Sequence, residues 1–406
     1  MHIITLGGYG HFGGLLSCQL AKEPIRLTIA GRSKQKAEQF IQKNLTQAAA
    51  TVYAAAIDAR DISLAEHLRE LQADLVIYTI GPFQEQDYHV ARSCILAGSH
   101  YLDLADARDY VANFSELDHL AKAQGVTALG GASTLPALSS AVIAHFLAYF
   151  QQLTHLDYAI SLGNKTTRGE ATVSAILSYC GKPFTTLIQN RMHSVYGWQS
   201  THRMDFATAM GQRWISNCDV PDLALFPAMY PTLQTQRFYA GLELGILHLG
   251  LWGLTWLVRW RLISNLAAWC KPIIRLGEYF HHFGSENSSM IMHLSGIDHR
   301  GEALNIEWRL LAQDNHGPII PTIPALILAR RIARGEIFSS GAAPCTKRIT
   351  LHEFTQAVSH LHIQQSVHYN GQDINIDLSN QIIIDLLQKS FFNQFHIVNG
   401  GDQIQA

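Results

Sequence analysis

Residues 2–14 read HIITLGGYGHFGG, an apolar run typical of a strand that passes directly into a glycine-rich turn. The glycines have the spacing G-x-G-x-x-G, which is the dinucleotide-binding fingerprint when it lies between a strand and a helix. The first glycine permits the tight turn, the second admits the pyrophosphate, and the third lets helix and strand pack closely. The phosphates would then lie on free N–H groups at the helix N-terminus. The residues expected to hold them are Gly8, Gly10, His11, Phe12 and Gly13.

From residue 1 to about residue 130, short β-rich runs alternate with helical patterns. Strands are expected at His2–Leu6, Ile25–Ala30, Thr51–Ile57, Asp74–Ile80, His100–Leu104 and Val126–Leu129. Helices are expected at Ser33–Lys43, Ser63–Leu71, Glu85–Ala97 and Ala107–Gln124. Because parallel strands need crossover helices, this alternation predicts an α/β fold with a doubly wound parallel sheet, the Rossmann type. Ligands of such sheets bind beyond the carboxyl ends of the strands.

The chain has 406 residues, more than one hydrophobic core usually supports, so two domains are expected. Charged residues make up 15% and apolar residues 48%, which excludes the disordered class. Thirty Lys and Arg against 32 Asp and Glu provide no basic excess for nucleic acid. The six cysteines and 21 histidines lack ligand spacing, so no metal site is predicted. The start resembles no signal peptide, and a cytoplasmic protein with reduced thiols is expected.

The end of the second expected strand bears on the choice of cofactor. An NAD site would place Asp or Glu here to bind the ribose 2′-hydroxyl, whereas this chain has Arg32 followed by Ser33. A guanidinium pairs well with a 2′-phosphate, so we expect NADP(H), with NAD(H) the weaker ligand. Lys36 would add a second cation, and Asp58 would meet the adenine edge. The alternative is a solvated helix start with Ser33 as N-cap and Asp58 as a turn residue.

Three further blocks follow the glycine turn in a specific order. They are GPF at 81–83, HYLDLAD at 100–106 and GASTLPALSS at 131–140. With the GGYGHFG start, this succession resembles the saccharopine-dehydrogenase-like oxidoreductases, in the branch that is not the lysine-pathway enzyme itself. The resemblance extends from Met1 to about Leu351, including GNKTTRGEAT, CDVPDL and GAAPC, and it is strongest in the first 140 residues.

The resemblance implies roles for several of these residues. Gly81, Pro82 and Phe83 would lie against the dinucleotide, where backbone must approach closely. Asp103 would face the nicotinamide side of the crevice and act in catalysis. Asp106, in contrast, is expected to be the N-cap of the following helix.

The third block would form the crossing into the second domain, beside the nicotinamide ring. The residues expected there are Ser133, Thr134 and Pro136. The alternative is that the two hydroxyl residues cap the helix that begins near the proline. The lysine-pathway relatives have an Asp-Pro-Gly-like turn at this crossing, where the present chain has Leu135-Pro136-Ala137. An identical substrate is therefore not expected.

A polar loop follows the strand expected at Asp157–Leu162. Lys165 and Arg168 in this loop are the cationic candidates for holding a substrate carboxylate or polarising a carbonyl. The alternative is a polar loop that caps the helix beginning near Glu170. Arg213 is a weaker candidate of the same kind.

Residues 238–258 form the most apolar stretch, interrupted only by Glu243 and His248, and basic and aromatic residues alternate from there to residue 275. Its length approaches that of a bilayer span. Three interpretations stay open. A helix buried in a homodimer interface is the first, peripheral contact of 238–275 with a membrane or lipid store is the second, and a true span, which would split the domain, is the third. We expect the homodimer.

These observations predict a dinucleotide-binding domain at 1–132 and a substrate and dimerisation α+β domain at 133–317. Residues 318–349 would pack back on the first domain, and 350–406 would be a C-terminal extension. The expected function is NADP(H)-dependent hydride transfer to or from a small organic substrate. The alternative is a non-catalytic NADP(H)-binding protein, associated with lipid or membrane, because Rossmann folds host many functions.

Overall fold

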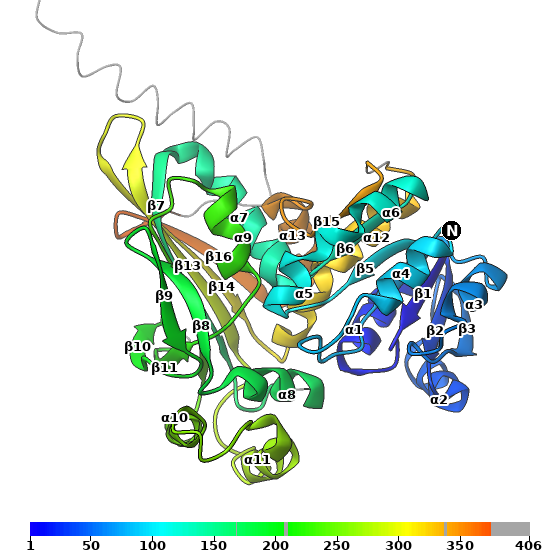
Figure 1. The fold of residues 1–406 in the computed structure, drawn as a ribbon, viewed down its shortest axis with the longest axis horizontal. Helices are drawn as coiled ribbons and strands as arrows, with labels where there is room; N and C mark the ends of the chain where they lie inside the picture. The colour runs from blue at the N-terminus through cyan, green and yellow to red at the C-terminus, as the bar shows by residue number, and fades with distance from the viewer. Residues whose placement is uncertain (168, 207–209, 337–338, 375–406) are drawn as a thin grey trace, which may run out of the picture.

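The computed structural model describes residues 1–167, 169–206, 210–336 and 339–374. Two β-sheets with their helices form the molecule (Figure 1). The first sheet has seven parallel strands in the order β15-β6-β5-β4-β1-β2-β3, and the second has eight strands in the order β10-β11-β12-β7-β13-β14-β16-β17. The predicted α/β architecture with a doubly wound parallel sheet is confirmed. Arg168 lies outside the described residues.

The strands of the first sheet come almost entirely from the N-terminal third. They are β1 (His2–Leu6), β2 (Arg26–Gly31), β3 (Thr51–Ala56), β4 (Leu75–Tyr78), β5 (His100–Asp103) and β6 (Thr127–Gly130). Every residue of β1 and β4 is buried, as expected for central parallel strands covered by helices on both faces. β1 pairs with β2 on one side and with β4 on the other. The direction of winding reverses between β1 and β4, and ligands bind at that switch point.

The helices around this sheet agree with the predicted ones except in one place. They are α1 (His11–Leu20), α2 (Lys34–Asn44), α3 (Leu64–Glu70), α4 (His89–Leu96), α5 (Arg108–Ala112), η1 (Phe114–Leu117) and α6 (Asp118–Ala123). The single helix predicted at Ala107–Gln124 is therefore wrong, because the segment is broken into three short helices. Phe114 is fully buried and stacks on Tyr101 at 5.9 Å between ring centroids. Burial of this ring against the sheet is favoured over one continuous helix, so the segment is divided at Phe114.

The seventh strand, β15 (Gly341–Pro344), joins the first sheet from late in the chain and pairs in parallel with β6. Before it come η5 (Gly317–Thr322) and α12 (Ile323–Ala333), and both pack against α1. The domain limits proposed from the sequence stay predictions. The structure shows that the chain returns to its first sheet after most of the second has formed.

The second sheet is mixed and is built around a long central strand. Its strands are β7 (Phe150–Leu162), β10 (His202–Asp205), β11 (Gln212–Asn217), β12 (Thr235–Leu242), β13 (Ser288–Asp298), β14 (Ala303–Ala312), β16 (Ile363–Tyr369) and β17 (Gln372–Ile374). A separate hairpin consists of β8 (Pro183–Ile188) and β9 (Arg191–Tyr196). The helices of this part are η2 (Thr134–Leu138), α7 (Ser139–Phe146), η3 (Leu147–Tyr149), α8 (Glu170–Tyr179), α9 (Asp222–Met229) and α13 (Leu351–Val358).

The two sheets share a continuous apolar core. One cluster of buried side chains runs from Leu27 in β2 through Leu138 and Leu326 to Trp308 in β14. Helices α7, α12 and α13 lie between the sheets and supply much of it (Figure 1). Removing this apolar surface from water holds the two halves together.

The prediction of one helix over the apolar stretch 238–258 is wrong. Its first residues belong to β12, which pairs in parallel with β7. Helix α10 (Gly245–Arg259) begins only afterwards, and η4 (Ala267–Trp269) and α11 (Cys270–Glu278) follow. Buried parallel strands and apolar helices have the same composition, so hydrophobicity alone does not separate them. In the part of the chain that the structure describes, no helix combines the length and apolar character that crossing a bilayer requires.

Candidate dinucleotide and substrate site

The glycine turn between β1 and α1 depends on two of its glycines for its own packing. A Cβ on Gly13 would lie 2.1 Å from the carbonyl oxygen of Gly7, and a Cβ on Gly8 would lie 2.2 Å from the Oγ1 of Thr5. Gly7 itself has a φ of +85°, in the left-handed region. These contacts explain the close approach of helix to strand that the motif predicts.

Gly10 differs from these glycines. A Cβ at this position would meet only the carbonyl oxygen of Gly7, at 3.1 Å. Gly10 is also the N-cap of α1 and supplies no side-chain hydrogen bond to the helix N-terminus. A Cβ on Gly10 would therefore crowd the turn less than one on Gly8 or Gly13, and a dinucleotide pyrophosphate that lies against uncapped N–H groups fits this glycine. The next residue, His11, is half-buried, and burial lowers the pKa of its imidazole.

The carboxyl end of β2 is closed by an aromatic side chain from the glycine turn. The Tyr9 hydroxyl accepts a hydrogen bond from the backbone N–H of Ser33 at 3.2 Å. A Cβ on Gly31 would lie 2.6 Å from the same hydroxyl oxygen. Tyr9 therefore ties the turn to the start of α2, at the edge where the sequence places the adenosine.

The polar residues proposed for the adenosine end have different surroundings. The Oγ of Ser33 accepts from the backbone N–H of Lys36 at 3.2 Å, so Ser33 is the N-cap of α2. Asp58 is exposed and accepts from the backbone N–H of Arg60 at 3.0 Å, as a turn residue does. Arg32 and Lys36 are both exposed. Three cations, Arg32, Lys34 and Lys36, thus follow β2, and the first acid after the strand is Glu38.

In the loop after β4, the ring of Phe83 is buried, so the backbone faces the ligand edge of the sheet. Phe83 is buried and contacts the rings of Tyr78 and Tyr110 at 5.5 and 5.4 Å between centroids. The side-chain amide of Gln86 donates to the carbonyl oxygens of Ile80 and Pro82 at 2.9 and 2.7 Å. The peptide bond between Gly81 and Pro82 is cis. The loop is therefore held in one shape from within.

Asp103 ends β5 but is completely buried. Its Oδ1 accepts from the backbone N–H groups of Ala105 and Gly131 at 3.0 and 2.7 Å. Burial raises the pKa of this carboxyl group to about 6, although the two amide hydrogen bonds oppose the shift. In this position Asp103 joins the ends of β5 and β6, and it does not reach solvent.

Asp106 does not cap a helix. The N-cap of α5 is Ala107, and no side chain caps that helix, so the assignment of Asp106 as N-cap is wrong. Asp106 instead accepts from the side-chain amide of Gln84 at 3.3 Å. Its side chain reaches solvent, yet the protein atoms around it raise its pKa. In the sequence, the position of Asp106 three residues after Asp103, which ends β5, could have indicated a role near the ligand edge of the sheet.

The crossing from β6 into the second half is buried throughout. Ser133 is the N-cap of η2, but its side chain makes no capping hydrogen bond. Thr134 and Pro136 are also buried, and the peptide bond before Pro136 is cis. Leu135 has extended backbone within η2. The three predicted residues therefore lie together where the chain leaves the first sheet.

Helix α8 lies along the carboxyl ends of the parallel strands and brings the second half to the glycine turn (Figure 1). A Cβ on Gly169, just before α8, would lie 3.3 Å from the Cβ of His11. A Cβ on Gly81 would lie 3.6 Å from that of Ala171. At the far end of α8, the charge of Asp106 contributes to raising the pKa of Tyr179, after burial. The start of α8 thus lies beside both the glycine turn and the loop after β4.

The loop that carries Lys165 is held in place by Glu243. In the sequence, Glu243 is visible only as a charged residue that interrupts an apolar run. The Glu243 carboxylate accepts from the backbone N–H groups of Asn164 and Ser285, both at 2.7 Å. It also binds Arg213, whose guanidinium donates to Oε1 at 3.0 Å and to the backbone carbonyl at 3.1 Å. Burial alone would raise the pKa of Glu243, but these hydrogen bonds outweigh it and lower the pKa. Arg213 is therefore a structural ion-pair partner, and its proposal as a substrate ligand is wrong.

Two acids of the CDVPDL segment, the half-buried Asp219 and the buried Asp222, were not singled out from the sequence. Asp219 binds the Arg108 guanidinium of α5 at 2.6 Å, which joins the two halves. Asp222 is fully buried and accepts from the Ser139 hydroxyl at 2.6 Å. Burial raises the pKa of Asp219 to about 6 and that of Asp222 to about 7.

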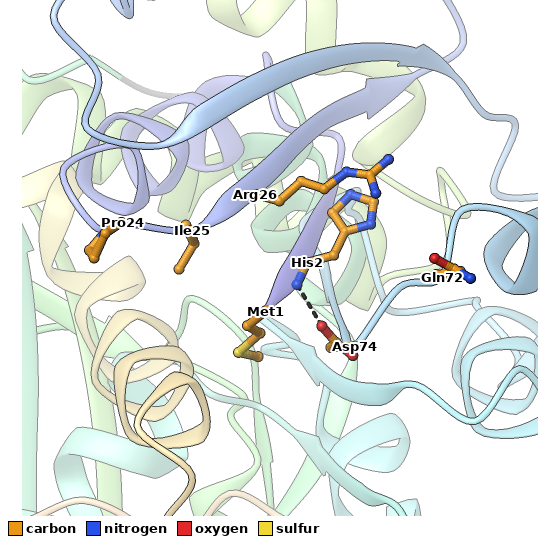
Figure 2. Close-up of a pocket in the computed structure, with 7 residues that line it drawn as sticks. All are labelled: Met1, His2, Pro24, Ile25, Arg26, Gln72 and Asp74. Carbon is orange, nitrogen blue, oxygen red and sulfur yellow. Dashed lines mark hydrogen bonds between the residues drawn. The ribbon is translucent and has the colours of Figure 1, made fainter.

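A hollow of about 530 Å³ lies elsewhere on the molecule (Figure 2). Its lining consists of Met1, His2, Pro24, Ile25, Arg26, Gln72 and Asp74. The backbone N–H of His2 donates to Asp74 at 2.6 Å across it. These residues lie at the amino ends of β1 and β2 and just before β4, opposite the edge where dinucleotides bind, so the hollow is not the candidate site. Across the described ranges, no group of three or more His, Cys, Asp or Glu side chains has the arrangement of a metal site.

Comparison with known proteins agrees with this geometry. Residues 3–129 match the family model described as the saccharopine dehydrogenase NADP binding domain. No curated protein sequence matches the chain. Among solved structures, saccharopine dehydrogenase (L-Glu forming) from Saccharomyces cerevisiae has 12% identity and a TM-score of 0.61, with 90% of this chain and 99% of that chain covered. Amine dehydrogenase from Mycobacterium smegmatis has 12% identity and a TM-score of 0.48, with 84% and 94% covered.

At this level of identity the yeast enzyme shares a fold, and the family model identifies the N-terminal part by sequence. The matched residues contain the glycine turn, the end of β2 and Asp103. Residues 3–129 therefore match the saccharopine dehydrogenase NADP binding domain by sequence, and the chain as a whole shares its fold with the yeast enzyme.

Proposed function

We propose that this protein is an NADP(H)-dependent oxidoreductase that transfers hydride to or from a small organic substrate. The observation that carries the proposal is Gly10. It stands at an uncapped helix N-terminus at the sheet's switch point, where a Cβ would meet one backbone oxygen at 3.1 Å. A dinucleotide whose pyrophosphate approaches this backbone closely is a further reason for a glycine here. The match of residues 3–129 to a dehydrogenase cofactor domain supports the same function.

The preference for NADP(H) rests on the end of β2. Arg32 is exposed immediately after the strand, and Lys36 is exposed on the first turn of α2. A 2′-phosphate beside them would gain charge-assisted hydrogen bonds, whereas a 2′-hydroxyl would find no carboxylate at this position. Asp58, at the end of the neighbouring strand, is occupied with its own turn.

When bound, the nicotinamide cofactor supplies the hydride chemistry. The chain's own residues bind and enclose the reactants. The backbone at Gly81, held by Gln86, and the start of α8, which lies against it, would form two adjoining walls of the site. Lys165, on the loop fastened by Glu243, is the residue proposed to hold or polarise the substrate. Enclosure between these walls would exclude water from the reacting atoms.

Titration calorimetry with NADPH and NADH tests the proposal directly. The wild-type protein is expected to bind NADPH, and Gly10→Val should abolish binding of both cofactors by filling the place of the pyrophosphate. Gly250→Val is the matched control, because a Cβ at Gly250 meets no atom within 4 Å. Turnover is then sought by following NADPH oxidation with carbonyl, imine and enoyl compounds. Absence of binding by the folded wild-type protein would reject the proposal.

A further inference from the structure

Exposed apolar side chains are concentrated on one part of the surface. Among the described residues, fifteen large apolar side chains are exposed, and ten of them lie between Ile246 and Phe283. The ten are Ile246, Leu249, Trp252, Leu254, Trp260, Leu262, Trp269, Leu276, Tyr279 and Phe283. We call this surface the α10–α11 face. So dense a patch marks an interaction site, since soluble proteins rarely leave one uncovered.

Helix α10 is inverted relative to an ordinary surface helix, because its polar residues point inward. His248 and Thr255 are fully buried, while the apolar residues between them are exposed or half-exposed. The His248 ring hydrogen-bonds the Ser216 hydroxyl at 2.9 Å, and burial lowers the pKa of this imidazole to about 4. Gln199 donates to the Thr255 hydroxyl at 3.3 Å. These buried hydrogen bonds determine which side of α10 faces the protein. The apolar side is therefore exposed because of how the helix packs.

The same segment is basic within an otherwise slightly acidic chain. Residues 245–283 contain four basic residues and one acidic residue, Glu278, whereas the whole chain has a net charge of −2. The basic residues are Arg259, Arg261, Lys271 and Arg275. All four are exposed among the apolar side chains. Exposed basic and aromatic residues on one segment suit an anionic lipid surface, where aromatic rings lie at the headgroup level and cations pair with phosphates.

A hollow of about 440 Å³ opens on the α10–α11 face. Its lining consists of apolar Leu249, the rings of Trp214, Trp252 and Trp256, the cation Arg259, and the polar residues Gln199, Ser200 and Thr201. The Arg259 guanidinium lies 4.1 Å from the centre of the Tyr196 ring and donates to the Gln199 side chain. A guanidinium has five donors, so this bond leaves others for an anionic oxygen. Apolar rings beside a cation and polar side chains suit a lipid phosphate and the first part of its chain.

We propose that the α10–α11 face docks on an anionic lipid surface, with the aromatic side chains inserted at headgroup depth and the basic residues paired with lipid phosphates. A second copy of the chain fits less well, because a twofold interface would place the same basic residues of two subunits against each other. Helices α8, α10 and α11 share a buried apolar cluster that includes Leu177, Val258 and Cys270. Docking would therefore hold α8, which lies along the proposed cofactor edge, close to the membrane surface.

Vesicle sedimentation of the full chain tests this proposal. Vesicles of phosphatidylcholine alone are compared with an equal mixture of phosphatidylcholine and phosphatidylglycerol, at low and high salt. The protein should pellet with the mixed vesicles, and salt should weaken the association. Trp260→Ser with Leu262→Ser should reduce the partition coefficient by about tenfold or more, since both side chains are largely exposed, at 63% and 68%. Ile62→Ser, at a site that is 92% exposed on the first domain, is the matched control.

The charge contribution is measured with a separate pair of variants. Lys271→Gln with Arg275→Gln should reduce partitioning to the mixed vesicles by about fivefold for each charge. Lys22→Gln with Lys43→Gln, both exposed on the first domain, should leave it unchanged. Equal pelleting with neutral and anionic vesicles would overturn the assignment of an anionic surface. A protein that stays in the supernatant with both would overturn docking altogether, and a dimer in solution that Trp260→Ser with Leu262→Ser dissociates would assign the face to a second copy instead.

Discussion

Gly169 lies directly against His11: a Cβ on Gly169 would come within 3.3 Å of the His11 Cβ. The first residue is in the loop before α8 of the second half, and the other begins α1 beside the glycine turn. A residue of the second half thus touches the segment on which a pyrophosphate is proposed to lie. Cofactor binding and the position of α8 are therefore expected to depend on each other.

Gly169→Val should weaken NADPH binding by about fivefold, because two added methyl groups push against His11, and overpacking of this kind costs about 1 kcal/mol. The backbone of Gly169, with φ of −74°, accepts any residue, so folding should be unaffected. Calorimetry measures the affinity, and thermal unfolding confirms the fold. Unchanged affinity would show that α8 can withdraw from the glycine turn without cost.

Arg32→Ala should lower the affinity for NADPH by about ten- to hundredfold, since a charge-assisted hydrogen bond contributes about 1.5–3 kcal/mol. Binding of NADH should barely change, because it lacks the phosphate that the guanidinium would meet. The comparison of both cofactors on wild type and variant by calorimetry measures the preference. Equal affinities of the wild type for NADPH and NADH would refute the role of Arg32.

Lys165→Ala should lower kcat by about a hundredfold or more while leaving the NADPH dissociation constant unchanged. The side chain is proposed to act on the substrate, and its loop is held in place by backbone bonds that the substitution retains. Lys43→Ala, exposed on α2, is the control. Loss of NADPH binding by a folded Lys165→Ala protein would mean that the loop serves the cofactor instead.

The stability of the protein should fall as pH rises through neutrality, in part because of Asp222. Burial raises the pKa of Asp222 to about 7 from its ordinary value of 3.8, so the folded protein retains a proton that the unfolded chain releases. Its contribution to stability is complete below about pH 4 and is lost as pH passes about 7. A shift of one unit corresponds to about 1.4 kcal/mol, which sets an upper limit of about 4 kcal/mol.

Asp222→Asn removes this titration while keeping the shape of the side chain. The loss of unfolding free energy between pH 5 and 8, followed by chemical denaturation, should therefore be smaller in the variant than in the wild type. Asp58→Asn, at an exposed turn, should behave as the wild type does. Identical pH profiles for wild type and Asp222→Asn would show that Asp222 is ionised in the folded state.

The sequence predicted the first sheet well because its information is local. The strand–glycine–helix succession at residues 2–14 determines both the turn and the position of the proposed cofactor site. Ser33 caps α2 through a hydrogen bond with Lys36, only three residues further along the chain. The errors arose where distant residues decide the outcome. Residues 238–242 form a strand because β7 pairs with them, which apolar composition does not reveal.

In the candidate site, too, the errors arose where contacts between distant residues decide the role of a side chain. Asp106 looked like a helix cap because acids commonly precede helices, yet its hydrogen-bond partner, Gln84, comes from another loop 22 residues away. Arg213 looked free to bind a substrate, since its partner Glu243 is 30 residues further along. Pairing between buried charges depends on the tertiary fold and leaves no periodic pattern to detect.

The position of β15 has a consequence for the order in which the protein is made. Its four residues complete the parallel sheet beside β6, but the ribosome releases them only after more than 200 further residues of the second half. Until then the growing chain carries an open sheet edge at β6, with its backbone N–H and carbonyl groups available to any other strand. The nascent protein should accordingly be most prone to mispairing in the interval before residue 344 emerges, and a fragment ending at residue 132 would keep that edge permanently.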